Sequence, residues 1–266
     1  MRIHTLGTSH GDSTFCRFKS CTVYETVDGV LYAVDAGAPA EALIRRKGLS
    51  LGALRTIFIS HMHDDHAGGL PGVMKQVTKH KQNRMQPLTL FLPEANAVNA
   101  LKQWFFAVHE PADDALLKYQ TIDDGIIYSD DYIIVTAIRT DHLRTHGRTV
   151  GDSCSFAFVL HFNKENITVL HTGDMRADLA DFPTIAYNQE FDVCVAEATH
   201  YPPALGAQVF SKARFARLIF THIHDPWHTR VLSDGQVDNG EERLLSYYKG
   251  LPYPVCIAHD GEDFVF

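Results

Sequence analysis

The chain has 266 residues, with 24 Lys or Arg, 32 Asp or Glu and 16 His, and a formal net charge of -8 at pH 7. This length is enough to bury a sizeable core, and the composition excludes a fibrous or disordered chain. The negative charge, without a long block of Lys and Arg, argues against a nonspecific grip on nucleic-acid phosphates.

Cysteine usage and the N-terminal residues bear on the compartment. The five cysteines are scattered without a Cys-x-x-Cys pair, which is typical of reduced residues. The start "MRIHTLGTSHGDSTF" lacks a charged head followed by an apolar core, and no apolar run approaches the roughly 20 residues that cross a bilayer. We therefore expect a cytoplasmic protein with no membrane partner.

Short segments rich in Val, Ile, Phe and Tyr are typical of strands, and here they end at chemically active residues. The predicted strands are 30–34, 55–60, 132–138, 166–172, 191–196 and 216–221. The acids and histidines that follow them are Asp35, His61, Asp141 with His142, Asp174, Glu197 with His200, and His222. In sheets that helices cover, ligands gather outside the carboxyl ends of the strands. We expect these side chains to meet at one edge.

Helices are predicted over 39–49, 69–82 and 94–108, from a Pro near one start, a Gly near one end, and apolar spacings of three and four. The acidic, irregular segment 109–130 is predicted to be a lid or an insertion. Because no repeat, low-complexity segment or linker divides the chain, we expect one domain over 1–266.

The segment "HMHDDH" concentrates metal-binding side chains within six positions. Alternate residues of an extended segment face the same way, so His61 and His63 can aim at one point. Asp65 and His66 then curl back toward a neighbouring point. Imidazole nitrogens and carboxylate oxygens are ligands of zinc and similar cations, and this many donors packed together without a cation would be costly. The segment predicts two adjacent metal sites.

The remaining ligands must come from the other strand ends. Asp174 can bridge two cations, while His142 completes the first site and His222 the second. Two cations roughly 3.5 to 4 Å apart hold a hydroxide between them and stabilise the charge on the attacked group. This arrangement predicts hydrolysis.

These motifs resemble the metallo-β-lactamase superfamily, whose His-x-His-x-Asp-His signature is intact here. "LYAVDAG", "LHTGDM" and "LIFTHIH" are similar to further segments of that family, so the resemblance covers nearly the whole chain. It implies an α/β fold, a four-layer αββα sandwich. It implies one metal held by His61, His63 and His142, a second held by Asp65, His66 and His222, Asp174 between them, and Asp35 bracing the ligand loop.

Within the superfamily the nearest pattern is that of tRNase Z and its phosphodiesterase relatives. The N-terminal "LGT", "FDVCVAEATH" and "CIAHDGEDF" are similar to segments of that group. The resemblance implies that Glu197 helps to protonate the leaving oxygen. The family's later Ser/Thr-flanked histidine is missing, so His200 is the candidate proton donor. The short stretch between His142 and Asp174 leaves no room for the arm that grips RNA.

Two ligand assignments keep competitors, because His146 lies close to His142 in "TDHLRTHG" and His259 competes with His222. We favour His142, which is nearer the strand, and His222, which alone follows the apolar-apolar-Thr-His pattern. The identity of the general acid also stays open between His200 and Glu197.

The sequence thus predicts a metal-dependent hydrolase with two divalent ions, most simply Zn²⁺, with Mn²⁺ or Fe²⁺ as alternatives. The expected reaction is attack of a metal-bridging hydroxide, oriented by Asp65, on a small or cyclic phosphodiester. The alternatives are hydrolysis of a lactone, thioester or β-lactam, or a non-catalytic ligand sensor on the same scaffold. We do not expect nucleic acid as a partner, and a homodimer stays open.

Overall fold

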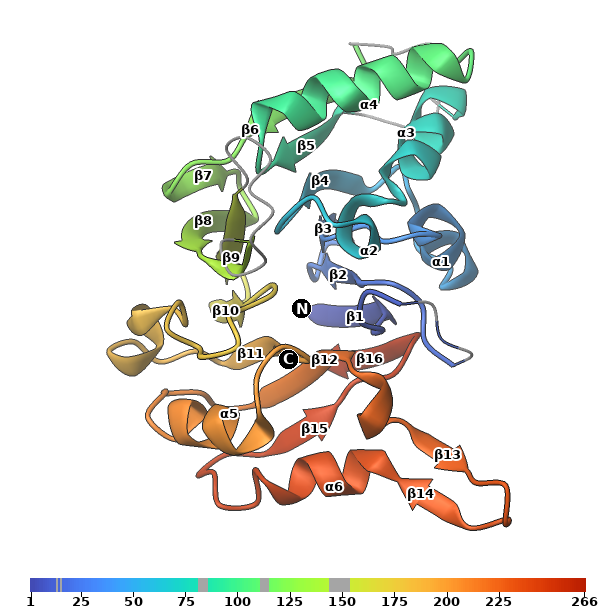
Figure 1. Cartoon of the computed structure of the whole chain (residues 1–266). Coiled ribbons are helices and arrows are strands. Elements are labelled where there is room, and N and C mark those ends of the chain that lie inside the picture. Colours follow the sequence, from blue (N-terminus) through green and yellow to red (C-terminus); the bar gives the residue numbers. More distant parts are fainter. Residues whose placement is uncertain (13, 15, 81–85, 111–114, 144–153) are drawn as a thin grey trace.

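The protein is described by a computed structural model that covers residues 1–12, 14, 16–80, 86–110, 115–143 and 154–266. In this part of the chain, two seven-stranded sheets lie face to face and helices cover their outer faces (Figure 1). None of the helices described combines the length and the apolar composition that a membrane span requires.

The first sheet contains most of the N-terminal strands and one C-terminal strand. Its strand order is β16 (Glu262–Val265), β1 (Arg2–Gly7), β2 (Cys21–Glu25), β3 (Leu31–Val34), β4 (Leu54–Phe58), β5 (Leu88–Leu92) and β6 (Leu117–Thr121). The first three pairings along this order are antiparallel and the last three are parallel.

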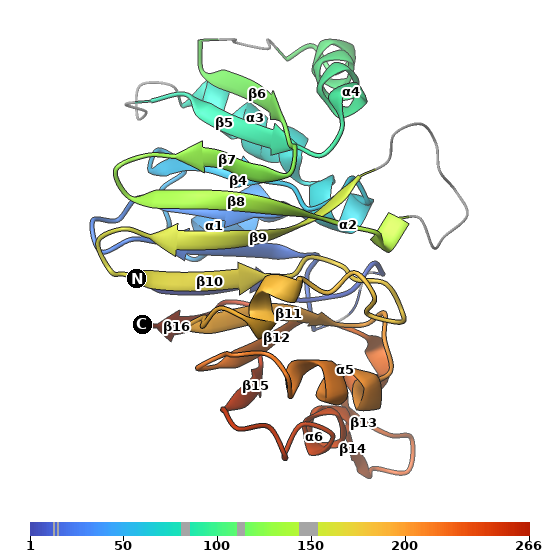
Figure 2. The ribbon, with the colours of Figure 1, turned by 90° about the vertical axis from the view of Figure 1, so that its left-hand side faces the viewer.

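The second sheet repeats this arrangement of pairings (Figure 2). Its strand order is β7 (Gly125–Ser129), β8 (Ile133–Thr140), β9 (Ser155–Phe162), β10 (Ile167–His171), β11 (Val193–Ala198), β12 (Leu218–Ile223) and β15 (Val255–Ile257). Again three antiparallel pairings precede three parallel ones. A separate hairpin joins β13 (Thr229–Val231) to β14 (Val237–Asn239).

The helices lie on opposite sides of the sandwich. The first sheet is covered by α1 (Ala40–Arg46), α3 (Leu70–Lys79) and α4 (Ala95–Ala107), and the short α2 (Asp64–Ala67) follows β4. The second sheet is covered by α5 (Pro203–Phe210), α6 (Gly240–Ser246) and the 3-10 turn η3 (Thr184–Tyr187). A further 3-10 turn, η4, spans Asp225–Trp227.

Alternation along the strands divides the buried apolar residues into three layers. In β3, Tyr32 and Val34 pack between the sheets, whereas Leu31 and Ala33 pack against the helices. Each large side chain buried in this way stabilises the fold by about 1.5 to 3 kcal/mol. Because both faces of each sheet are covered, strand ends are the places where polar groups can gather without disturbing the core.

The six predicted strands and the three predicted helices are all present, within a few residues of the expected bounds. The prediction for residues 109–130 is wrong, because their described part contains β6 and β7, one edge strand in each sheet. Strand β6 is largely exposed and β7 is partly exposed, with Gln120 and Ile126 facing solvent. A polar edge strand such as β6, or one with as short an apolar run as β7, lacks the long apolar pattern by which buried strands are recognised.

Candidate metal centre

The segment that follows β4 places four candidate ligands at one edge of the sandwich. His63 has an extended backbone and directly precedes α2. The Nε2 atom of His61 therefore lies 2.8 Å from the Nδ1 atom of His63. The turn of α2 then brings Asp65 and His66 back toward the same edge, where both are buried. The curl predicted from the spacing is confirmed.

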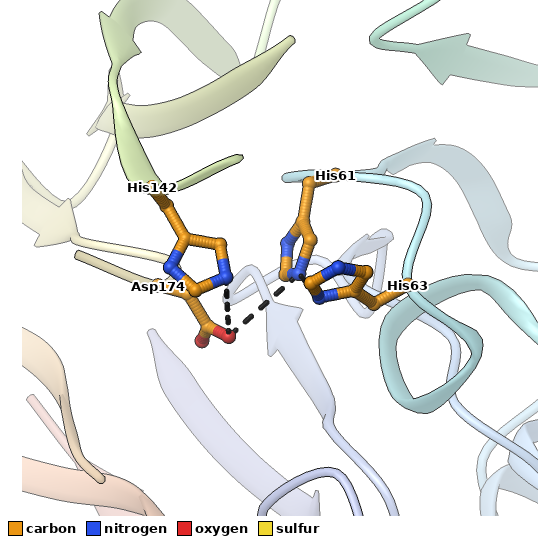
Figure 3. A group of neighbouring side chains, drawn as sticks. All are labelled: His61, His63, His142 and Asp174. Carbon is orange, nitrogen blue, oxygen red and sulfur yellow. Dashed lines mark hydrogen bonds and ion pairs between the residues drawn. The ribbon is translucent and has the colours of Figure 1, made fainter. Parts of the chain in front are cut away.

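Three residues from the second sheet reach this edge. His142 follows β8, Asp174 follows β10, and His222 lies within β12. Figure 3 shows the imidazoles of His61 and His142 turned toward the carboxylate of Asp174. Two groups then have all their ligand atoms within 4.8 Å of one another: His61, His63, His142 and Asp174, and separately Asp65, His66 and His222. The structure thus brings all seven predicted ligand residues together.

Asp174 lies at the centre of the cluster. Its Oδ2 atom is 3.4 Å from Nε2 of both His66 and His222, and 3.7 Å from Nε2 of both His61 and His142. Its Oδ1 atom is buried and has no hydrogen-bond partner among the described residues. A buried carboxylate oxygen normally has a partner. Imidazole and carboxylate donors around an unsatisfied oxygen are the chemistry that divalent cations bind, so these residues fit a metal.

A second set of contacts fixes the orientation of the imidazoles. The Asp35 carboxylate lies 2.7 Å from His66 Nδ1 and accepts hydrogen bonds from both the backbone amide and the hydroxyl of Ser60. Ser20 Oγ lies 2.9 Å from His222 Nδ1, and His142 Nδ1 lies 3.2 Å from the carbonyl of Met175. With each Nδ1 engaged, each Nε2 faces the cluster, which is the usual support for a metal-binding histidine.

Two of these residues have an uncommon backbone conformation. Asp35 and His222 have φ values of 62° and 52°, in the left-handed region that non-glycine residues rarely adopt. Such conformations cost of order 1 to 3 kcal/mol and tend to occur at functional sites. Here they turn the two side chains toward the cluster, Asp35 directly after β3 and His222 among the last two residues of β12.

The charges of the cluster are set by burial and by the central carboxylates. Burial lowers the pKa of His61, His63, His142 and His222, so these rings are neutral and can donate a lone pair to a cation. Burial by itself would raise the pKa of Asp174, but the neighbouring imidazoles, His222 foremost, hold it well below its usual value.

His66 differs from the other imidazoles. Burial by itself would lower its pKa, but the carboxylates of Asp174 and Asp35 raise it well above the ordinary value. Its proton balances charge among the surrounding acids. A cation held by these groups would take over this role, because a ligating imidazole nitrogen carries no proton.

Glu197, near the end of β11, and His200, which follows that strand, lie beside the cluster. His200 Nδ1 is 2.7 Å from Glu197 Oε2 and 3.8 Å from Asp174 Oδ2. Glu197 is buried, and it accepts hydrogen bonds from the backbone amides of Met175, Thr199 and His200. Burial by itself would lower the pKa of His200, but Glu197 and Asp174 raise it to about 9. One ring nitrogen of His200 also lies within 4.8 Å of ligand atoms of Asp174 and His222.

The competing histidines fall into two classes. His259 is exposed and contacts Glu241 and Glu262, so among the described residues His222 joins the cluster and His259 does not. His146 lies outside the described residues. The sequence reasoning missed Ser20, Ser60 and Met175, whose contacts depend on how distant segments meet and carry no local signal.

Comparison with known proteins supports this assignment of fold. Ribonuclease Z of Lactobacillus gasseri is 31% identical over 147 residues, which cover 53% of this chain and 46% of that protein. The chain therefore spans about half the length of the curated relatives it matches.

Solved structures resemble the chain over its whole length. The metallo-β-lactamase fold protein YhfI from Bacillus subtilis has a TM-score of 0.72 at 14% identity and covers 99% of both chains. The short form of human tRNase Z has a TM-score of 0.72 at 20% identity and covers 100% of this chain and 99% of that one. The predicted metallo-β-lactamase fold and the likeness to tRNase Z are confirmed.

A more specific relationship comes from the sequence. The family described as Anti-Pycsar protein Apyc1 matches residues 1–200 of the 266. This stretch contains the motif residues 61–66, His142, Asp174 and the Glu197–His200 pair. Since the match extends over most of the chain, the protein belongs to the Anti-Pycsar protein Apyc1 family.

Proposed function

We propose that the protein is a dinuclear metal-dependent phosphodiesterase that acts on a small or cyclic phosphodiester. The observation that carries the proposal is the position of His200, a candidate proton donor, beside two adjacent groups of metal ligands. His61, His63 and His142 would hold one cation, Asp65, His66 and His222 the other, and Asp174 both. Two divalent cations, most simply Zn²⁺, would supply an ionised water near neutral pH and offset charge developing on the phosphate.

Asp65 is the candidate for orienting the nucleophile. Although burial opposes ionisation, the hydrogen bond with His66 and the positive charge of that ring lower the pKa of Asp65 to about 2. The carboxylate is therefore ionised at every physiological pH and can only accept hydrogen bonds. An attacking water that donates to this carboxylate would keep one lone pair directed at phosphorus.

His200 is the candidate general acid. With a pKa of about 9, its ring is protonated near neutral pH. Glu197 engages Nδ1 at 2.7 Å, which leaves Nε2 as the donor toward the leaving oxygen. Because three backbone amides hold Glu197, the pair keeps its geometry as the proton is transferred.

The substrate class follows from the surroundings of the site. The chain between His142 and Asp174 contains β9 and β10, so few residues remain there for an arm that binds RNA. The net charge of -8 also disfavours a long polyanion. Likeness to ribonuclease Z supports cleavage of a phosphodiester bond, and a small substrate needs no extended binding surface.

A substrate panel tests the reaction class. Bis-p-nitrophenyl phosphate, a cyclic nucleotide, an acyl lactone and nitrocefin would each be assayed with zinc and with manganese. We expect turnover of the two phosphodiesters. Turnover of the lactone or of nitrocefin alone would overturn the phosphodiesterase proposal in favour of an acyl hydrolase on the same scaffold. Binding of a metabolite without any hydrolysis would favour a ligand sensor.

The role of His200 is tested by its dependence on the leaving group. In the H200Q variant we expect hydrolysis of the cyclic nucleotide to fall about 100-fold, because its alkoxide needs a proton to leave. Hydrolysis of bis-p-nitrophenyl phosphate should fall less than about tenfold, since p-nitrophenolate leaves without one. The matched control is H259Q, an exposed position away from the cluster. Equal losses for both substrates would contradict a proton-donor role.

A further inference from the structure

The loop that follows β1 lies against the metal cluster, although its described residues contribute none of the candidate ligands. The carbonyl of Thr8 accepts a hydrogen bond from the backbone amide of Ile223 at 2.8 Å, and Ser9 forms a parallel bridge with the same residue. Ile223 directly follows His222, a member of the cluster. The loop of residues 8–12 therefore begins beside a candidate metal ligand.

Gly11, an exposed residue of this loop, faces Asp65. A Cβ atom at this position would lie 3.8 Å from Asp65 Oδ2 and 4.0 Å from Oδ1, and Asp65 supplies its three nearest neighbours among the described residues. These distances are ordinary van der Waals contacts. The space beside the carboxylate can therefore accept a carbon atom without displacing any described group.

The backbone does not require a glycine at this position. The φ angle of Gly11 lies outside the left-handed region in which glycine is favoured. By contrast, a Cβ atom at Gly37 would lie 2.2 Å from the carbonyl oxygen of Asp65, so that glycine is needed for close packing. Since neither strain nor a clash accounts for Gly11, its distinguishing property is the open space that it leaves beside Asp65.

Neighbouring contacts hold the loop in place. Ser9 Oγ donates a hydrogen bond to the carbonyl of Asp12 at 3.1 Å, and the amide of Asp12 donates one to His10 Nδ1 at 3.3 Å. His10 is only 6% exposed, and its Nε2 atom lies 3.1 Å from Asp225 Oδ1. Because Gly11 lies between His10 and Asp12, these contacts fix the position of the open space.

The open space adjoins the second group of candidate ligands. Its nearest neighbour, Asp65 Oδ2, also lies 3.2 Å from His66 Nε2 and 3.8 Å from His222 Nε2. In the proposed reaction His200 serves the leaving oxygen, whereas Asp65 orients the attacking water. Because the attacking and leaving oxygens lie in line, a group beside Gly11 belongs to the ester substituent that stays on phosphorus.

We propose that Gly11 sets the size of the ester substituent that the substrate retains, because its missing side chain leaves room for that group beside Asp65. This inference rests on the proposed phosphodiesterase function. It assigns the open space to a substituent of the size of an aromatic ring. A side chain at residue 11 would exclude such a group by direct contact while leaving the metal ligands in place.

The variant G11V tests this role, with G250V as its matched control. Gly250 is likewise exposed, has a φ angle outside the left-handed region, and has no described atom within 4 Å of a Cβ placed there. Methyl p-nitrophenyl phosphate and bis-p-nitrophenyl phosphate release the same leaving group and differ only in the retained substituent. In G11V, kcat/KM should fall about tenfold or more for the bis ester and less than about threefold for the methyl ester. G250V should leave the ratio of the two unchanged.

Ligand binding gives a readout that needs no turnover. Zinc-loaded protein would be titrated calorimetrically with methylphosphonate and with phenylphosphonate. We expect G11V to weaken the binding of phenylphosphonate about tenfold and that of methylphosphonate less than about threefold. The metal content of G11V, measured by elemental analysis, should equal that of wild type. G11A, with its smaller side chain, should give intermediate losses.

The outcomes distinguish the role of Gly11 from the phosphodiesterase function. Equal losses of both phosphonates in G11V, loss of metal from this variant, or no binding of either phosphonate to wild type would overturn the role of Gly11. If wild type hydrolyses both esters and G11V keeps their ratio, the role of Gly11 fails and the phosphodiesterase function stands. If wild type hydrolyses neither ester but G11V selectively loses phenylphosphonate, the role of Gly11 in access stands and the phosphodiesterase function fails.

Discussion

The two ends of the sandwich each hold a carboxylate surrounded by polar side chains, but only one of these clusters is complete. Asp130 precedes β8 and Asp174 lies with the residues that follow β8 and β10, so the two acids mark opposite ends. The Asp130 carboxylate accepts hydrogen bonds from the side chains of Tyr32, Arg55 and Tyr128 and from the backbone amides of Tyr132 and Ile133.

The difference lies in what satisfies each acid. Both oxygens of Asp130 have donors from the protein, at 2.6 to 3.0 Å. Asp174 has five imidazoles nearby, yet its Oδ1 atom has no hydrogen-bond partner among the described residues. A polar cluster whose groups all have hydrogen-bond partners stabilises the contact between two sheets. A buried carboxylate oxygen without such a partner is instead suited to bind a cation.

Metal removal gives the largest expected effect. Elemental analysis of the purified protein should find about two equivalents of divalent metal per chain. Chelation should abolish hydrolysis and lower the free energy of unfolding by about 4 kcal/mol, the linkage expected for metal at 1,000 times its Kd. Adding zinc back should restore both. If no metal is bound after preparation in metal-supplemented medium, the proposal that this cluster binds metal is contradicted.

Substitution of the central acids should separate the two ends. D174N should lower phosphodiester turnover about 1,000-fold and reduce the metal content, because the carboxylate serves both groups of ligands. The matched variant D130N should leave metal content and turnover within about twofold. Similar turnover in D174N and D130N would contradict a role for Asp174 in the metal cluster.

Removal of the Asp35 carboxylate, which orients His66 at the metal cluster, should have an intermediate effect. In D35A no carboxylate accepts a hydrogen bond from His66 Nδ1, so the ring is less firmly oriented. We therefore expect metal affinity to fall about 10- to 100-fold. Competition with a chromogenic chelator measures this directly. An unchanged affinity would show that the packing of the ligand loop alone fixes the imidazole.

The smallest expected effect concerns Asp130, whose contribution to the free energy of unfolding should depend on pH. Burial by itself would raise the pKa of Asp130, but hydrogen bonds from Tyr32 and two backbone amides hold it below its usual value. Its stabilisation is therefore complete at neutral pH and is lost as the pH falls through the lowered pKa.

Urea unfolding of chelated protein tests this prediction. D130N should be less stable than wild type by about 1 to 3 kcal/mol at neutral pH. The difference should shrink on acidification into the range where Asp130 gains a proton. A difference that stays constant with pH would show that the loss comes from packing and not from the carboxylate charge.

Much of the site could be predicted because its chemistry is local in sequence. The motif from His61 to His66 carries four donors in one turn, and strand ends marked by Asp174 and His222 follow apolar runs that are easy to recognise. Likeness to a known superfamily then assigned the ligands to two groups. Each assignment needed only the direction of a strand and the residue that follows it.

The contacts that support the site could not be predicted in this way. Ser20 and His222 are far apart in sequence, and their contact depends on how the two sheets lie against each other. The edge strand β6 was missed because exposed polar residues interrupt its apolar pattern, and β7 because its apolar run is only three residues long. How the two sheets pack against each other, and which strands lie at their edges, depend on the whole fold. A short window of sequence does not contain this information.

The candidate ligands come from both sheets: residues 61–66 follow a strand of the first, whereas His142, Asp174 and His222 belong to the second. Ions coordinated by both sets would act as a crosslink across the sandwich, in the way that a disulfide joins distant segments. Under mechanical load, or in slow opening detected by hydrogen exchange, this edge should then separate last in the loaded protein and first after chelation. The proposed catalytic ions would then also hold the two sheets together at this edge.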